Sequence, residues 1–394
     1  HYPTVLLRGR GTAGVGRFYF REWGRPMNPQ IPDALNLTLS SQLDLSKRRL
    51  QTLSWLIIGM INARTVNLSH IASQFSGRAQ VASSYRRLQR FFQYVALDGD
   101  WLAEAVIKLL KLRPPWLLAL DRTNWKIGRR DVNILMLAVI TQRARLPLMW
   151  VILDKPGTSN AAERIKLLRR YCTLFGPSSI RLLLCDREFI GQTWIEYLLD
   201  NNILFAIRVK ENSHVVLDDG RAYQLKSLLR KAYGGKLLAA RSGHFRTMAE
   251  SNLPAIRFAA KRLADGQLLI IATNIKPARA LKLYRRRWSI ECLFGDSKTR
   301  GLNMEDTRLT DPKKLNTLLV VITLAMAWAY ASATLLKGHK TIRKGNQGYR
   351  LKSWFRCGFD QLRKWLLHHP DKAIQAWQRA WPKRKSTLKF YRAV

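Results

Sequence analysis

The spacing of apolar and polar positions divides the chain into a helical part followed by alternating strands and helices. Over residues 32–112 apolar positions recur at helical spacing, and Ser46 is the predicted N-cap of the first long helix. Two shorter amphipathic segments, 67–75 and 82–94, predict two helices joined by a turn. The pair Pro114-Pro115 then marks the end of this helical part.

Apolar runs and amphipathic segments alternate after residue 115. Three runs with short connections predict strands, and a helix, a strand, a helix and a strand follow them. The predicted strands cover 116–125, 132–142, 147–157, 179–189 and 204–212, and the predicted helices cover 160–175 and 193–202. This order predicts a mixed sheet covered by helices, in which the first and fourth strands lie side by side and parallel.

The second half of the chain departs from this alternation in two places. Residues 211–280 hold short strands separated by turn signals, which predict a small β-rich insertion, and helical periodicity then runs from Ala278 through Gly301. Further on, no charged residue occurs between Leu315 and Leu336, a stretch long enough to span a membrane. Because this stretch is rich in Ala and is diluted by Asn, Thr and Ser, it predicts a helix buried on all sides in a soluble core.

The charge of the chain indicates what kind of partner it binds. Lys and Arg number 68 against 26 Asp and Glu, for a formal net charge of +42. Such a chain is suited to a long polyanion, held through phosphate contacts that release counterions, and DNA, RNA and an anionic membrane surface all satisfy this. The four cysteines lie far apart without metal-ligand spacing, which predicts neither a disulfide framework nor a structural zinc site.

Three arginines are placed to meet such a polyanion in the helical part. Arg86, Arg87 and Arg90 are predicted to face outward on the second of the two helices joined by a turn. This arrangement is typical of a helix that docks on DNA, although an ordinary solvated basic face has the same pattern.

Two aspartates close apolar runs in a chain that has few carboxylates. Asp121 ends the run LLALD and Asp186 ends the run RLLLCD, so both are predicted at strand ends on one edge of the sheet, where α/β folds place their sites. An isolated carboxylate taken out of water costs several kcal/mol or more unless a cation or hydrogen bonds compensate. Divalent metal is one such compensation, and an aspartate that caps a turn is the alternative.

A third acid lies on a polar helix face. Tyr284, Arg287, Glu291, Gly295 and Lys298 step by three and four residues and therefore share one side of the predicted helix. The face is either solvated, with an ion pair between Arg287 and Glu291, or a phosphate-binding surface with an acid at its centre. In the second case Gly295 would let a nucleic-acid strand approach the backbone.

In combination these residues resemble the DDE transposases. Asp121 after a strand, Asp186 in a C-D-R-E context, and the series Tyr284, Arg287, Glu291 and Lys298 look like the insertion-sequence-four group with its Y-R-E-K signature. The resemblance covers roughly residues 40–336. It implies an α/β fold: an RNase H-like, mixed-sheet catalytic core with a β-rich insertion, preceded by an all-α DNA-binding region.

The resemblance also implies a site and a reaction. Asp121, Asp186 and Glu291 are expected to be catalytic and to hold two Mg²⁺ or Mn²⁺ ions, with Asp121 shared between them. Hydrolysis would expose a 3′-OH at each element end, and that hydroxyl would attack target DNA. DNA contacts are expected from Tyr284, Arg287, Lys298, Arg187, Trp288, Arg86, Arg87 and Arg90.

Other residues have lesser expected roles. The insertion lacks the Trp on which some members of the family stack a flipped base, and the candidate substitutes are Trp288, Phe245 and Tyr223. The remaining acids near the site are expected to be turn or surface residues, with Glu188 also a candidate to support Asp186. These acids are Asp131, Asp154, Glu188 and Asp296.

The expected organisation has four parts. They are a basic arm or non-native leader (1–31), a helical DNA-binding domain (32–113), the catalytic domain (114–336) and a basic C-terminal region (337–394). The expected partners are double-stranded DNA, as terminal inverted repeats and as target, and a second copy of the chain in a homodimer. No membrane is expected, and the location would be the cytoplasm, with the nucleoid. Two alternatives stay open: an RNase H-like nuclease that never joins DNA, and a non-catalytic DNA-binding regulator derived from a transposase.

Overall fold

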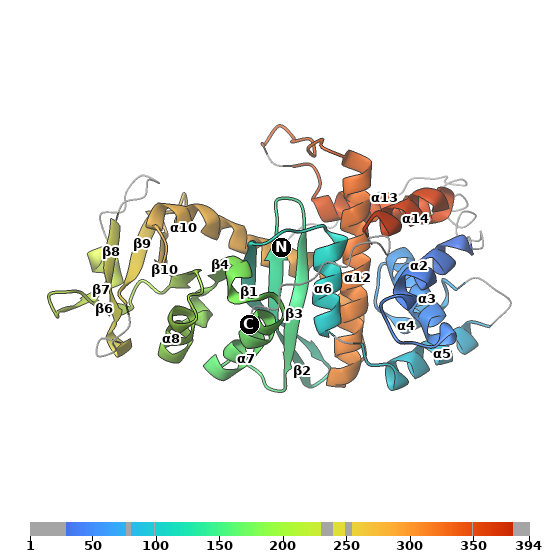
Figure 1. The fold of residues 1–394 in the computed structure, drawn as a ribbon, viewed down its shortest axis with the longest axis horizontal. Coiled ribbons are helices and arrows are strands. Elements are labelled where there is room, and N and C mark those ends of the chain that lie inside the picture. Colours follow the sequence, from blue (N-terminus) through green and yellow to red (C-terminus); the bar gives the residue numbers. More distant parts are fainter. Residues whose placement is uncertain are drawn as a thin grey trace, which may run out of the picture.

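The computed structural model describes residues 29–380 apart from 76–79, 98, 230–238, 249–253 and 349. Most of the predicted basic arm and the last residues of the predicted C-terminal region therefore lie outside the described residues. The described chain forms an elongated body with helices at one end, a large sheet in the middle and the β-rich insertion at the other end (Figure 1).

The N-terminal helices pack around a shared apolar core. They are α2 (Gln30–Ser40), α3 (Lys47–Ala63), α4 (Leu68–Ala72), α5 (Val81–Tyr94) and α6 (Gly99–Leu109). Ser46 occupies the N-cap position of α3 as predicted, but its side chain makes no capping hydrogen bond. On α3 the apolar residues Leu53, Leu56 and Ile57 are fully buried, so burial of one face rather than the cap stabilises this helix.

One mixed sheet of ten strands runs through the molecule, in the order β3-β2-β1-β4-β5-β10-β9-β8-β6-β7. The catalytic half of the sheet contains β1 (Trp116–Ile127), β2 (Arg130–Ile140), β3 (Arg145–Leu153), β4 (Ile180–Cys185) and β5 (Phe205–Val209). The first three strands form the predicted antiparallel meander, and β4 and β5 join it in parallel. The predicted pairing of the first and fourth strands is therefore confirmed, as is the mixed α/β fold class.

Two helices make the connections that parallel strands require. Helix α7 (Ala161–Phe175) links β3 to β4, and it begins with a capping box between Asn160 and Glu163. Helix α8 (Gln192–Asp200) links β4 to β5. Both helices were predicted from their amphipathic patterns.

The β-rich insertion extends the same sheet. Its strands are β6 (His214–Val216), β7 (Ala222–Gln224), β8 (Ala239–Phe245), β9 (Ile256–Arg262) and β10 (Leu268–Thr273), with the short helix α9 (Leu225–Leu228) between β7 and β8. Because β10 pairs antiparallel with β5, the backbone hydrogen bonds of the catalytic sheet continue into the insertion. The insertion is thereby fixed in orientation relative to the core.

The predicted helix over 278–301 is wrong in one respect, since it is two helices. Helix α10 (Pro277–Tyr284) and helix α11 (Trp288–Ser297) are separated by a turn of 3₁₀-helix, η4 (Arg285–Arg287). In a 3₁₀ turn residues three apart lie directly above each other, so Tyr284 and Arg287 both reach the sheet.

The uncharged stretch forms the central helix α12 (Pro312–Lys337). By length and composition it could cross a membrane, but 83% of its most apolar window is buried inside the protein. It contacts α3, α6 and β3, and it packs against α13 (Trp354–His368) and α14 (Pro370–Ala380), as Figure 1 shows. The stretch is thus a buried core helix, as predicted.

Candidate active site

Asp121 and Asp186 lie side by side across two parallel strands. The pairing of β1 with β4 ends at Leu120 opposite Cys185, and each of these residues is followed by one of the aspartates. The prediction that Asp121 ends its strand is wrong, because β1 continues to Ile127 by pairing with β2. Only β4 ends here, and its end leaves the two carboxylates next to each other.

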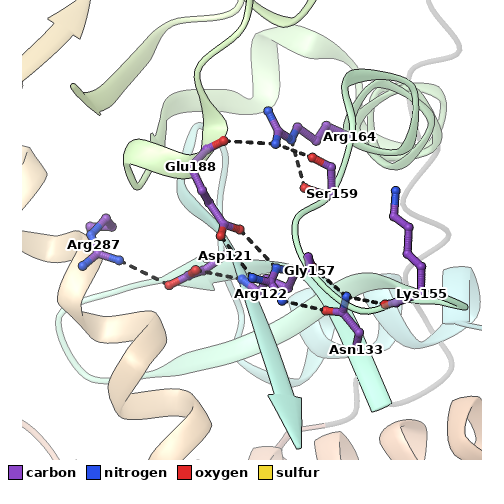
Figure 2. Close-up of polar contacts among 9 residues, drawn as sticks. All are labelled: Asp121, Arg122, Asn133, Lys155, Gly157, Ser159, Arg164, Glu188 and Arg287. Atoms are coloured by element: carbon purple, nitrogen blue, oxygen red, sulfur yellow. Dashed lines mark hydrogen bonds and ion pairs between the residues drawn. The ribbon is translucent and has the colours of Figure 1, made fainter. Parts of the chain in front are cut away.

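The carboxylate of Asp121 is mostly buried. The backbone amide of Arg122 donates to Oδ1 at 2.8 Å, and Nη1 of Arg287 donates to Oδ2 at 3.2 Å (Figure 2). The pKa of Asp121 is raised to about 6, chiefly by burial and also by the nearby Asp186 and Glu188, against the opposing effect of these two donors. Removal from water is therefore the main cost of ionising this carboxyl group.

Asp186 has an oxygen without a partner. It follows β4 directly, and its Oδ1 atom is buried with no hydrogen-bond partner among the described residues. Leaving a buried acceptor unsatisfied costs roughly 1–3 kcal/mol, more for a charged group. A hard divalent cation takes carboxylate oxygens of this kind, so Asp121 and Asp186 together fit such an ion.

Glu291 is held by an arginine rather than placed beside the two aspartates. It lies in the first turn of α11, where Nη2 of Arg287 donates to its Oε1 atom. Arg287 itself is only 8% exposed and bridges Glu291 and Asp121. Within the described ranges, no three His, Cys, Asp or Glu side chains are grouped closely enough to hold a metal ion.

Glu188 lies in a turn as predicted, and it also contacts the residue next to Asp121. It lies in a 3₁₀ turn just after Asp186, and its two oxygens accept from Nε and Nη2 of Arg122 at 3.4 and 3.3 Å (Figure 2). Arg122 also donates to Oδ1 of Asn133 at 3.1 Å. Since Arg122 and Glu188 each lie within two residues of a predicted catalytic aspartate, the predicted strand pairing could have revealed this contact.

A second arginine fixes the backbone of that turn. Nη2 of Arg164 on α7 donates to the carbonyl oxygen of Glu188 at 3.0 Å, and Nε donates to Oγ of Ser159 at 2.9 Å. Nδ2 of Asn133 donates to the carbonyl oxygens of Lys155 and Gly157, which belong to the same loop as Ser159. The loop before α7 and the turn after Asp186 are therefore held together, as Figure 2 shows.

The other two residues of the Y-R-E-K series, Tyr284 and Lys298, contact backbone carbonyl oxygens of the sheet instead of standing on a solvated face. The hydroxyl of Tyr284 is buried and donates to the carbonyl oxygen of Cys185 at 3.1 Å. Lys298 donates to the carbonyl oxygen of Asn124 at 3.4 Å and forms an ion pair with Glu305 at 2.8 Å. Both side chains thus contact protein atoms near the two aspartates.

Aromatic candidates for base stacking differ in their exposure. Trp288, directly after Arg287, is 62% exposed. Phe245 is buried against Phe258, with ring centroids 5.1 Å apart, and is therefore not available to a base. Tyr223 is half-buried and donates its hydroxyl proton to Asp219. Of the three, Trp288 alone offers an exposed ring beside the site.

Two further expectations about α11 are corrected by side-chain contacts. Gly295 faces the guanidinium of Arg300, so the space left by its missing side chain is filled by this chain's own arginine. Asp296, expected at the surface, is buried and forms an ion pair with Arg145 of β3 at 2.8 Å. It anchors α11 to the sheet.

The three arginines of α5 do not behave alike. Arg86 and Arg90 are exposed, whereas Arg87 is half-buried and donates to Oγ1 of Thr52 at 2.8 Å and to Oε1 of Gln51 at 3.0 Å. All three line a groove of about 620 Å³ between α3 and α5, which Arg48 and others complete. The prediction that they face outward therefore fails for Arg87.

Arg187 lies on the insertion side of the site. It is exposed and lines a hollow of about 770 Å³ where β5 meets the insertion. Arg208, Lys210 and Lys226 line the same hollow, which is therefore basic.

A family model described as a transposase DDE domain matches residues 112–328, more than half of the chain. The matched segment begins just before β1 and ends within α12, so it contains Asp121, Asp186 and Glu291. No curated protein matches the chain.

Proposed function

Since this chain belongs to the DDE transposase family, we propose that it moves a bacterial insertion sequence of the insertion-sequence-four group by cutting and joining DNA. It would bind the terminal inverted repeats, expose a 3′-OH at each element end and join these ends to target DNA. The observation that carries this proposal is the juxtaposition of Asp121 and Asp186 under the helix that bears Glu291.

Carboxylate oxygens are the donors that Mg²⁺ and Mn²⁺ prefer, and the site offers several. Asp121 and Asp186 would hold the first ion, and Glu291 would complete the set of ligands. When bound, two such ions activate the attacking oxygen and stabilise the leaving oxygen of a phosphodiester. The raised pKa of Asp121 and the unpaired Oδ1 of Asp186 support this assignment.

The side chains at the site favour direct attack by water or by a DNA hydroxyl. Cys185 and Tyr284, the two potential protein nucleophiles beside the aspartates, are both buried. Burial raises the pKa of each well above its ordinary value, so neither forms an anion readily. We therefore propose no covalent protein–DNA intermediate.

Basic side chains around the site would hold the DNA. The exposed Arg187 directly follows Asp186, Lys298 contacts the backbone of Asn124 close to Asp121, and Trp288 offers a ring on which a base can stack. On the helical part, Arg86 and Arg90 of α5 would contact the terminal repeat. The net charge of +42 supplies the general attraction to DNA.

The test is a reaction of the full chain with the DNA that flanks its gene. A labelled duplex carrying each flank is incubated with Mg²⁺ and scored for cleavage, and a second duplex with a pre-cut 3′-OH is scored for joining to plasmid DNA. The proposal predicts cleavage at both flanks and joining. Cleavage without joining would instead indicate a nuclease, and tight binding without cleavage would indicate a regulator.

Two further parts of the proposal concern assembly and location. An element has two ends, so we propose that a homodimer holds both during the reaction, in the cytoplasm and on the nucleoid. Light scattering of the chain with and without an end duplex tests this assembly. One chain per duplex at all protein concentrations would contradict it.

A further inference from the structure

We infer that Arg287 keeps the metal site incomplete until DNA is bound. In the structure this arginine bridges Asp121 and Glu291, and we infer that a DNA phosphate draws it away so that both carboxylates become free for the ion. This inference rests on the proposed function, since it assumes that DNA and a divalent ion meet at these acids.

One guanidinium occupies lone pairs on two of the three acids. Nη1 of Arg287 donates to Oδ2 of Asp121 at 3.2 Å, and Nη2 donates to Oε1 of Glu291. With both nitrogens engaged, the guanidinium lies between the two carboxylates. Arg287 thus engages Asp121 and Glu291, whereas Oδ1 of Asp186 has no hydrogen-bond partner among the described residues.

A divalent metal ion and the guanidinium of Arg287 exclude each other at these carboxylates. Both carry positive charge and both use the same carboxylate oxygens. In a site that is largely shielded from water, like charges at contact distance repel strongly. Glu291 can therefore join an ion at Asp121 and Asp186 only after Arg287 has moved.

Arg287 needs another anion to bind before it can leave the carboxylates of Asp121 and Glu291. A buried guanidinium without a partner is costly, and Arg287 is 8% exposed. Its surroundings open toward solvent on one side, because Trp288 is exposed and one third of the Glu291 side chain is accessible. A phosphate offers the same two-oxygen geometry as a carboxylate, so DNA arriving on that side can replace both contacts.

The consequence is reciprocal coupling between the two ligands. If DNA removes Arg287 from the acids, DNA must raise the affinity for the ion, and the ion must raise the affinity for DNA by the same factor. Without DNA the ion would bind weakly, and cleavage chemistry would be confined to the bound complex.

Binding of Mn²⁺ to the full chain without DNA, followed by calorimetry, tests the bridge directly. Arg287→Gln frees the carboxylates and should bind Mn²⁺ about tenfold more tightly than wild type, or about 1.4 kcal/mol. Arg285→Gln is the matched control, since it removes the same charge from an exposed side chain of the same turn. The inference fails if Arg287→Gln binds Mn²⁺ no more tightly than Arg285→Gln.

A second measurement adds a mixed-sequence DNA duplex. Wild type should gain Mn²⁺ affinity on binding the duplex, and Arg287→Gln should gain much less. Glu291→Gln provides a test that does not depend on the folding of the arginine variant. Without DNA, Glu291→Gln should bind Mn²⁺ as tightly as wild type. With DNA, it should bind Mn²⁺ more weakly than wild type. A weaker Mn²⁺ affinity of Glu291→Gln already in the absence of DNA would contradict the inference.

Failure of this inference is distinct from failure of the proposed function. If wild type cuts flanking DNA but the arginine variant shows no gain in Mn²⁺ affinity, only the bridging role of Arg287 is lost. If wild type binds no Mn²⁺ even with DNA and cuts nothing, the proposed metal chemistry itself is wrong.

Discussion

The hydroxyl of Tyr284 donates a hydrogen bond to the carbonyl oxygen of Cys185, 3.1 Å away. This bond ties the end of α10 to the end of β4, one residue before Asp186. It fixes the distance between α10, which leads into the helix that carries Glu291, and the strand that Asp186 follows. Tyr284 is therefore placed to position the site rather than to reach DNA.

Tyr284→Phe should lower stability and leave DNA affinity unchanged. The change removes one buried hydrogen bond, which costs about 0.5–1.5 kcal/mol. Urea unfolding measures the loss, and a mobility-shift titration measures DNA binding. A variant of normal stability that binds DNA weakly would support the direct DNA contact that the sequence predicted.

The arginines of α5 should separate into two classes. Arg86→Ala removes an exposed cation, so it should weaken DNA binding and reduce the slope of log affinity against log salt by about 1. Arg87→Ala should instead lower stability by about 1–3 kcal/mol, because it removes hydrogen bonds to Thr52 and Gln51. Equal effects of both changes on the salt slope would show that Arg87 also contacts phosphate.

Asp296→Ala should destabilise the protein strongly. It leaves the partly buried Arg145 without this partner, and breaking a fully buried ion pair in this way costs about 3–5 kcal/mol, which is the upper limit here. Asp154→Ala is the matched control, since Asp154 is exposed and a surface change of this kind costs about 0.5 kcal/mol or less. If thermal melting shows no difference between the two variants, the ion pair is not what anchors α11.

Asp121 should make stability depend on pH below neutrality. Burial raises its pKa in the folded state from 3.8 to about 6, so the folded protein binds this proton more tightly than the unfolded chain. Stability from this group therefore falls as pH rises from about 4 to about 6 and stays constant above.

Asp121→Asn removes that dependence. In metal-free buffer at pH 8 the variant should be more stable than wild type by on the order of 2 kcal/mol, and the difference should shrink toward pH 4. Denaturant unfolding at several pH values measures it. A variant that is less stable at pH 8 would show that the contacts of the ionised carboxylate outweigh its burial.

The sequence was sufficient to predict what depends on local pattern and on strand order. Apolar runs located the strands, and the order of strands and helices placed Asp121 beside Asp186. It did not show how far β1 continues past Asp121, because that depends on pairing with β2. An amphipathic pattern also cannot show which side chains from distant parts of the sequence will contact a given residue in the folded protein.

That limit accounts for the misplaced side chains. Arg87 faces inward because Gln51 and Thr52 of α3 are within reach, and Asp296 is buried because Arg145 of a distant strand meets it. The break between α10 and α11 likewise reflects contacts of Tyr284 and Arg287 with the sheet. Each error follows from a tertiary contact and not from a misread local preference.

The central claim is that Asp121, Asp186 and Glu291 act together on DNA. Its most direct test is Mg²⁺-dependent cleavage of the flanking duplex by Asp121→Asn, Asp186→Asn and Glu291→Gln, with Asp131→Asn and Asp154→Asn as exposed-acid controls. The account predicts that each of the three variants binds the duplex but gives no detectable cleavage, while both controls cut like wild type. Cleavage at the wild-type rate by all three variants would contradict it.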